Sequence, residues 1–196
     1  MAQAIVLPLL QKEKFLSKQV FAVVGRRSSV ERLAGKLPEG LRLVSSEESN
    51  ASDVWSAPIQ LLAVKPQQLS AVASEQRTLS KGAKPLLISV LAGVDLASLQ
   101  EAFPGHICVR AVPNAPALVG EGLTGISWGE GVSEGNRLCV KDIFEPVSEV
   151  LELPESQLDA FLALTSSGPA FIAVMAEALT DGAVASGLPR ELAHYL

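Results

Sequence analysis

The sequence predicts an α/β fold, in which a mostly parallel sheet is followed by a segment made only of helices. Two observations lead to this prediction. Short apolar runs alternate with helix-like stretches up to residue 153, and the runs at 59–64 and 86–91 are apolar almost without interruption. Such runs suit strands that are covered on both faces, and their alternation with helices is typical of parallel sheets. From Glu155 onward the chain has the pattern of helix only.

The expected elements of the first part are short and closely spaced. Strands are predicted at residues 20–24, 41–44, 59–64, 86–91, 107–112, 123–128 and 147–153. Helices are predicted at residues 2–11, 29–36, 67–80, 95–103 and 133–144. The helix at 2–11 corresponds to the first helix of a doubly wound nucleotide-binding fold, but neither a strand nor a Gly-x-Gly-x-x-Gly turn precedes it. We therefore expect a parallel sheet that lacks its first strand, which in this fold lies centrally.

The helical part has one clear apolar stripe. Its members follow the spacing i, i+3, i+4, i+7 and i+8, and they are Phe171, Val174, Met175, Ala178 and Leu179. Pro169 lies where a helix can begin, and Gly187 with Pro189 marks a stop and a new start. We place a dinucleotide-binding-type domain at 1–153 and the beginning of a helical domain at 154–196. The chain is therefore expected to be incomplete at both ends.

Composition excludes several classes of function. Hydrophobic residues make up 48% of the 196 residues, charged residues 19%, and the formal net charge is −5. An acidic chain without Lys/Arg clusters is not expected to bind nucleic acid or an anionic membrane. No apolar run is expected to approach the ~20 residues of a membrane-spanning helix. This balance predicts a globular protein with a sizeable core.

Metal, disulfide and hydrolase chemistry are not indicated. Cys108 and Cys139 form no CxxC pair, which fits free buried thiols in a reducing cytoplasm. His106 and His194 lie far apart, with no Cys or carboxylate at ligand spacing. No Gly-x-Ser-x-Gly elbow occurs. Hydride transfer remains compatible with the chain, because the cofactor supplies the reactive atom and the protein mainly positions it.

The turn after the first expected strand contains Arg26, Arg27, Ser28 and Ser29 but no acid. In a nucleotide-binding fold this turn meets the adenosine ribose. An acid there favours NAD, whereas an Arg can accept the 2′-phosphate of NADP. The four residues therefore allow an NADP site, although an ordinary polar turn explains them equally well.

Three further strand ends carry candidate ligand-binding residues. Lys65 and Pro66 stand where the run at 59–64 leaves the sheet, and Gly93 follows the run at 86–91. Asn114 stands between two prolines in a stiff loop after the run at 107–112. Ligands of open α/β sheets bind beyond the carboxyl ends of strands, so these positions are candidates for a site. Each is also compatible with a purely structural role.

Taken in order, these segments resemble the pyrroline-5-carboxylate reductase family. The resemblance rests on "LAVKPQ" (62–67), "ISVLAGV" (88–94), "VRAVPNAPALVGEG" (109–122) and "SGPAFIAVMAEALTDGAVASGLPRELA" (167–193). It implies a Rossmann-like domain followed by an all-helical dimerisation domain. It also implies NADPH-dependent reduction of 1-pyrroline-5-carboxylate to L-proline, with NADH as a possible alternative, in a cytoplasmic homo-oligomer built on a dimer. Ala115 departs from the Thr that is usual in the family's Pro-Asn-Thr-Pro loop.

The same resemblance assigns site residues by position. Near the adenosine end of the cofactor it implies Arg26, Arg27, Ser28 and Asn50. Near the ribose and nicotinamide it implies Val64, Lys65, Pro66, Ala92, Gly93 and Asn114. Near the substrate it implies Ser167 and Gly168. No catalytic acid or base is assigned, since a protonated imine is already electrophilic.

Two other hypotheses stand beside this one. The chain could be a related oxidoreductase of the same nucleotide-binding fold that acts on another small acid, although the helical stretch at 167–193 argues against it. It could also be a chain that catalyses nothing and associates through its helices. Because the glycine turn is absent, we expect residues 1–196 alone to bind NADPH weakly and to lack turnover.

Overall fold

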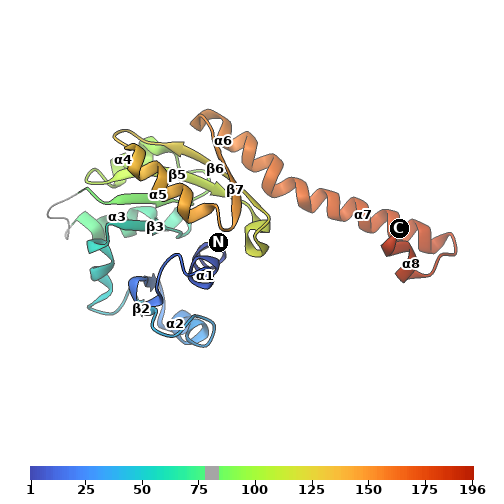
Figure 1. The fold of residues 1–196 in the computed structure, drawn as a ribbon, viewed down its shortest axis with the longest axis horizontal. Coiled ribbons are helices and arrows are strands. Elements are labelled where there is room, and N and C mark those ends of the chain that lie inside the picture. Colours follow the sequence, from blue (N-terminus) through green and yellow to red (C-terminus); the bar gives the residue numbers. More distant parts are fainter. Residues whose placement is uncertain (78–83) are drawn as a thin grey trace. The chain divides into compact units, whose positions relative to one another are not determined.

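The computed structural model describes residues 1–77 and 84–196, which divide into two compact units, Met1–Leu158 and Asp159–Leu196. Figure 1 shows the elements. The strands are β1 (Phe21–Val24), β2 (Arg42–Ser45), β3 (Ile59–Leu62), β4 (Leu86–Ser89), β5 (Ile107–Pro113), β6 (Gly122–Trp128) and β7 (Ser148–Glu152). The helices are α1 (Ala2–Gln11), α2 (Arg27–Ala34), α3 (Leu69–Arg77), α4 (Leu96–Ala102), α5 (Glu134–Phe144), α6 (Glu155–Leu162), α7 (Gly168–Ala185) and α8 (Arg190–Tyr195). Short 3₁₀ turns are η1 (Ser17–Gln19), η2 (Ala51–Ser56), η3 (Pro66–Gln68) and η4 (Ala115–Val119).

The strands of the first unit form two sheets. β1 and β2 pair in parallel, and five strands follow the order β3-β4-β5-β6-β7. Within the larger sheet only β5 and β6 run antiparallel to each other. Among the described residues β1 and β3 are therefore edge strands, each with a single strand partner. The predicted α/β fold is confirmed, and the interruption between β1 and β3 agrees with the expected lack of a central strand.

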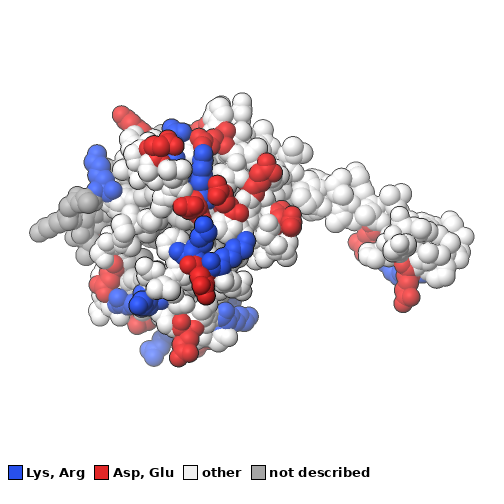
Figure 2. Space-filling view, viewed as in Figure 1, with Lys and Arg blue, Asp and Glu red and all other residues white. Residues whose placement is uncertain are grey.

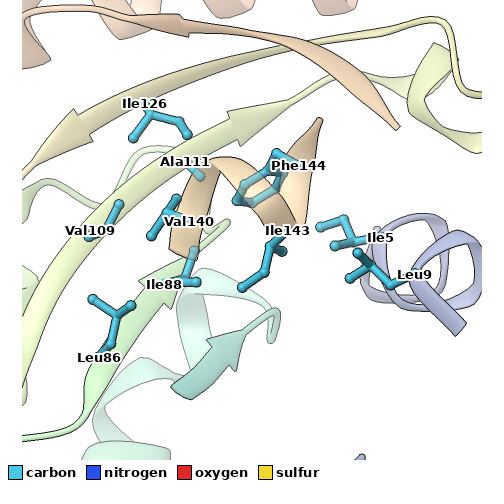
Figure 3. Packing of buried hydrophobic residues seen from close by; sticks show 10 residues of the cluster. All are labelled: Ile5, Leu9, Leu86, Ile88, Val109, Ala111, Ile126, Val140, Ile143 and Phe144. Atoms are coloured by element: carbon cyan, nitrogen blue, oxygen red, sulfur yellow. The ribbon is translucent and has the colours of Figure 1, made fainter. Parts of the chain in front are cut away.

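Both faces of the larger sheet are covered by apolar side chains. On one face α1 and α5 pack against β4, β5 and β6 (Figure 3), through Ile5, Leu9, Leu86, Ile88, Val109, Ala111, Ile126, Val140, Ile143 and Phe144. On the other face α3 and α4 cover the sheet through Leu62, Ala73, Leu87, Leu91, Val94, Leu99, Phe103 and Cys108. Alternate residues of β4 thus enter different clusters, and all four are buried. This two-sided burial is the reason for the uninterrupted apolar run in the sequence.

Most expected elements lie within two residues of their predicted bounds, with informative differences. α2 begins at Arg27, two residues earlier than predicted, so Arg27 and Ser28 belong to a helix rather than to a turn. α3 is described to Arg77, and the predicted residues 78–80 lie outside the described residues. Cys108 is buried as expected, whereas Cys139 is only half-buried.

The second unit follows its prediction only in part. Gly187 has φ +104° and α8 begins at Arg190, as the predicted stop and new start require. Pro169 lies in the first turn of α7 but starts no separate helix, because a π-helical stretch, Ala163–Ser167, joins α6 to α7 without a break. π-helical turns usually occur in this way, as single turns inserted in an otherwise continuous α-helix.

The expectation about membrane-spanning segments was wrong. The continuous helix Glu155–Ala185 has 31 residues and a mean hydropathy of 1.5 over its most apolar window, of which only 6% is buried. By length and composition alone it could cross a membrane. The predicted stripe residues Phe171, Val174, Met175 and Leu179 are all exposed. Figure 2 shows that charged side chains gather on the first unit and leave most of α7 uncharged. Helices that are apolar on every side are normally buried, in a protein core or in a membrane.

A buried histidine in the first unit predicts a pH-dependent stability. His106 is 3% exposed and lies against the rings of Trp55 and Phe103. Gln60 donates from Nε2 to the carbonyls of Trp55 and Ala57, so its Oε1 accepts from Nε2–H of His106 at 3.0 Å. Nδ1 of His106 is buried and has no hydrogen-bond partner among the described residues. Burial lowers the pKa of His106, because a proton on Nδ1 would leave a positive charge unpaired.

We expect the free energy of unfolding to fall as the pH drops below about 6.5, the ordinary pKa of histidine. Below that pH the unfolded chain binds a proton on His106 that the folded chain does not, which favours unfolding. Urea unfolding at pH 7.5 and 5.5 checks this for the wild type and for His106→Phe. The wild type should lose more stability than the variant over this range. Equal losses would show that carboxylates alone cause the acid sensitivity.

Candidate functional site

Four turns that follow strand ends carry most of the predicted site residues, and we call them together the carboxyl rim: 25–28, 64–68, 90–95 and 114. β3, β4 and β5 run parallel, so the turns that follow them lie at the same edge of the sheet. One close approach links the smaller sheet to this edge, since a Cβ at Gly25 would lie 3.9 Å from Nε2 of Gln68. At the end of the smaller sheet, Ser46 Oγ donates to the Gly25 carbonyl at 3.4 Å.

The adenosine end of the predicted site has three exposed polar residues. Arg26 is the N-cap of α2 with an extended backbone, and Arg27 and Ser28 form the first turn of that helix. Neither guanidinium forms an ion pair with a residue in the part of the chain that the structure describes. Two unpaired cations at a helix N-terminus are suited to bind a phosphate group.

Asn50 adds a buried acceptor at this end of the site. It stands at the start of η2, which packs against β1. Its Oδ1 is buried and meets no hydrogen-bond donor among residues 1–77 and 84–196. Buried amide oxygens in folded proteins nearly always have a donor, so a ligand group that supplies one would fit here. The family resemblance predicts Asn50 at this site, and its orphaned oxygen supports that prediction independently.

The turn after β3 is shaped by a residue that sequence analysis missed. Lys65 donates its backbone N–H to Oε1 of Gln68 at 3.2 Å, and Pro66 begins η3 between them. Val64 is half-buried and packs against the cluster below α3. Gln68 thus closes the turn and also faces Gly25 across the rim. The signal for Gln68 was its place three residues after Lys65, the spacing of a helix cap.

The turn after β4 is open and needs glycine. Ala92 and Gly93 are exposed, and Gly93 has φ +69°, a conformation that favours glycine. A Cβ at Gly93 would meet nothing within 4 Å among the described residues. The glycine is therefore required by the backbone conformation, and the space beside it is free for a ligand.

Asn114 has a structural role that the sequence did not show. Its side chain is almost fully buried, and Oδ1 accepts from the backbone N–H of Leu123 at 2.9 Å. The backbone N–H of Asn114 in turn donates to the carbonyl of Leu123 at 3.2 Å. Asn114 therefore ties the loop after β5 to β6. Its predicted contact with the cofactor stays a prediction.

The predicted substrate residues belong to the second unit. Ser167 is exposed in the π-helical stretch, and Gly168 is the first residue of α7. Thr165, in the same stretch, donates from Oγ1 to the carbonyl of Phe161 in α6 at 2.8 Å. The contact of Ser167 and Gly168 with a substrate stays a prediction.

Other features do not offer a better site. A depression of about 370 Å³ lies between α2, the turn at 37–41 and the amino end of β2. Its lining is mixed polar and apolar, and it lies at the opposite end of β2 from the carboxyl rim. Residues 1–77 and 84–196 contain no group of three His, Cys, Asp or Glu side chains placed to hold a metal ion.

Known proteins resemble this chain along its whole length. A pyrroline-5-carboxylate reductase from Synechocystis sp. is 40% identical over 197 aligned residues, which cover 100% of this chain and 71% of that protein. The chain belongs to the pyrroline-5-carboxylate reductase family. Relatives from Arabidopsis thaliana and Methanosarcina acetivorans align over 54% and 53% of their own lengths. The chain thus spans between about half and about seven-tenths of these reductases.

The fold and the helical part agree with membership in the reductase family. A solved reductase from Coxiella burnetii has a TM-score of 0.86 at 28% identity, covering 99% of this chain and 70% of that one. A Plasmodium falciparum pyrroline carboxylate reductase solved with NADP bound has a TM-score of 0.78 at 25% identity, covering 100% and 70%. Residues 155–196 match a family model described as pyrroline-5-carboxylate reductase dimerisation.

Proposed function

We propose that the site of this chain is built for the NADPH-dependent reduction of 1-pyrroline-5-carboxylate to L-proline in the cytoplasm. The turnover of residues 1–196 alone, which we expect to be low, is measured in the assays below. The observation that supports the proposal most is the 40% identity along the whole chain with the Synechocystis reductase. The carboxyl rim adds support, because it contains two exposed arginines and an open glycine turn, and α/β sheets bind ligands at such an edge. The orphaned buried amide oxygen of Asn50 is a further candidate acceptor. The NADP in the Plasmodium structure is a property of that relative and is consistent with the same cofactor here.

The residues of the rim would each hold one part of the cofactor. Reduced nicotinamide supplies a hydride when it is bound. Arg26 and Arg27 would bind the 2′-phosphate, and Asn50 Oδ1 would accept a hydrogen bond from the adenosine part. Gly93 would let its backbone lie close to the nicotinamide end, and Lys65 and Pro66 would border the ribose. Their task is positioning, since hydride transfer to a protonated imine requires no side-chain nucleophile.

We further propose that the chain acts as a homodimer. Residues 155–196 match the dimerisation region of the family. The apolar side chains of α7, among them Phe171, Ile172 and Met175, are more than half exposed. A second copy that covers them would remove apolar surface from water, which stabilises the complex by roughly 25 cal/mol for each Å² buried. A partner chain therefore accounts for the apolar helix more simply than a membrane does.

A second candidate is a chain that dimerises but does not catalyse. The interruption of the sheet between β1 and β3 favours it, since each strand pairs with only one neighbour among the described residues. Backbone N–H and C=O groups of β1 and β3 that lack a neighbouring strand would make the nearby carboxyl rim less rigid, and a less rigid rim would hold a cofactor less well.

Turnover assays on the purified chain decide between these candidates. NADPH oxidation is followed with 1-pyrroline-5-carboxylate as substrate, and proline is identified by mass spectrometry, while light scattering gives the oligomeric state. Proline formation by a dimer supports the proposal. A dimer without turnover supports the second candidate. Oxidation of NADPH only with oxo forms of other small acids would indicate a related oxidoreductase.

A further inference from the structure

Glu155 joins three elements of the first unit. Its Oε1 accepts from the backbone N–H of Leu96 at 2.7 Å and from Nη1 of Arg110 at 3.3 Å. Leu96 is the first residue of α4, Arg110 lies in β5, and Glu155 is the first residue of α6. The side chain of Arg110 is 4% exposed and that of Glu155 32%. One carboxylate oxygen therefore accepts hydrogen bonds both from a buried guanidinium and from the first amide of a helix.

This junction lies next to the glycine turn of the carboxyl rim. Only Val94 and Asp95 separate Gly93 from Leu96. Asp95 caps α4, since its Oδ1 accepts from the N–H of Ser98 at 2.7 Å. The hydrogen bonds from Ser98 lower the pKa of Asp95, and the charge of Arg110 contributes to that shift. Two carboxylates thus fix the chain just after the Ala92–Gly93 turn. Asp95 does so as the cap of α4, and Glu155 does so by accepting from Leu96, which precedes it by 59 residues.

The junction also contains the beginning of the dimerisation region. Glu155 is the first of the residues that match the family's dimerisation model. Exposed ion pairs contribute little, but a carboxylate that neutralises a buried guanidinium and accepts a backbone amide is costly to remove. The start of α6 thus contributes one of the contacts that hold Leu96.

We propose that Glu155 is a positioning residue for the nicotinamide end of the cofactor: it fixes the Ala92–Gly93 turn through the Leu96 amide and Arg110. This inference rests on the proposed function. It links the geometry of the cofactor site to the first residue of the dimerisation region, a link that no resemblance or motif assigns. Interactions at the adenosine end, around Arg26 and Asn50, should be independent of Glu155.

Two ligands and one ligand-free measurement test this role. NADPH reports on both ends of the site, whereas 2′,5′-ADP reports on the adenosine end only, and both affinities are measured by calorimetry on the full chain. Hydrogen exchange of residues 92–98 is measured without ligand. The variants are Glu155→Gln and Leu96→Pro. The second removes the amide donor at a helix position that tolerates proline and leaves the buried ion pair intact. Glu149→Gln, an exposed carboxylate on β7, is the matched control.

We expect both variants to weaken NADPH binding about three- to tenfold, a part of what one charge-assisted hydrogen bond contributes. Binding of 2′,5′-ADP should stay within twofold of the wild type (about the error of such comparisons). Exchange at residues 92–98 should become faster in both variants and stay unchanged in Glu149→Gln. Equal weakening of both ligands, or unchanged exchange at 92–98, would overturn the inference. A wild-type chain that binds neither ligand would overturn the proposed function first, and that result is visible before any variant is made.

Discussion

Replacing Gly129 by alanine should lower the free energy of unfolding by about 3 kcal/mol, at the upper end of what overpacking costs. Gly129 follows β6, and its N–H donates to the carbonyl of Cys108 at 3.0 Å. A Cβ at this position would overlap that carbonyl oxygen and would lie 3.3 Å from the carbonyl carbon. Because the obstacle is backbone in β5, no side-chain rotation relieves it.

The consequence extends beyond one contact. Moving the Cys108 carbonyl disturbs β5. This strand contributes Val109 to one core cluster and Cys108 to the other. The side chain of Leu96 also lies 3.5 Å from the added carbon. We therefore expect a single cooperative transition shifted down by roughly 10 °C, given about 2–4 °C for each kcal/mol in a chain of this size.

Gly135→Ala provides the matched control. Gly135 lies in α5, and the nearest atom to its added Cβ is Ser133 Oγ at 3.8 Å. Alanine there reduces the entropy of the unfolded chain without a clash, so stability should rise by about 0.4–1 kcal/mol. Thermal and urea unfolding of both variants provides the measurement. If Gly129→Ala is as stable as the wild type, the backbone of Gly129 does not lie as close to the Cys108 carbonyl as the structure shows.

The sheet illustrates how much of the fold is visible in the sequence. β4 was predicted because Leu86, Leu87 and Ile88 are all apolar, and the structure buries them on alternate faces. The antiparallel pairing of β5 and β6 was not predicted. Its signal was the short connection between the two strands, since a parallel crossover needs a dozen or more residues. Local pattern therefore identifies strands reliably, while strand direction depends on the length of the connection.

The site shows where sequence reasoning ends. Arg26, Lys65 and Gly93 could be found because each follows a strand end, and the carboxyl ends of parallel strands share one edge. The partners that position a site are different in kind. Asn114 holds Leu123 nine residues away, and Arg110 holds Glu155 across 45 residues. The sequence around one residue of such a pair does not indicate the other residue, because only the folded chain brings the pair into contact.

The exposed surface of α7 is a further case. Its apolar stripe predicts a helix, and α7 covers these residues, but the structure exposes them all and therefore does not test which face packs. The sequence cannot say whether the covering residues come from the same chain or from another copy. Only the exposure of Val174, Met175 and Leu179 in the structure, together with the match of 155–196 to a dimerisation region, indicates that a partner is needed.

Replacing both Arg26 and Arg27 by alanine should reduce the preference for NADPH over NADH at least tenfold. The two cofactors differ by the 2′-phosphate, and a charge-assisted contact to one arginine contributes about 1.5–3 kcal/mol, with about 1.4 kcal/mol for each factor of ten. Both guanidiniums are exposed and form no ion pair with the described residues, so their charges are available to a ligand. NADH binding should change little, because it lacks the group they contact.

The ratio of the two dissociation constants is the measurement, taken at two salt concentrations. Arg32→Ala is the matched control, since Arg32 lies on the same helix, is also exposed and follows Arg27 by more than one turn. In the wild type, added salt should weaken NADPH binding more than NADH binding, and the double variant should lose this difference. Since neither arginine packs in the core, thermal unfolding should be unchanged, which separates lost recognition from lost structure. An unaltered NADPH/NADH ratio in the double variant would show that the 2′-phosphate is bound elsewhere or not at all.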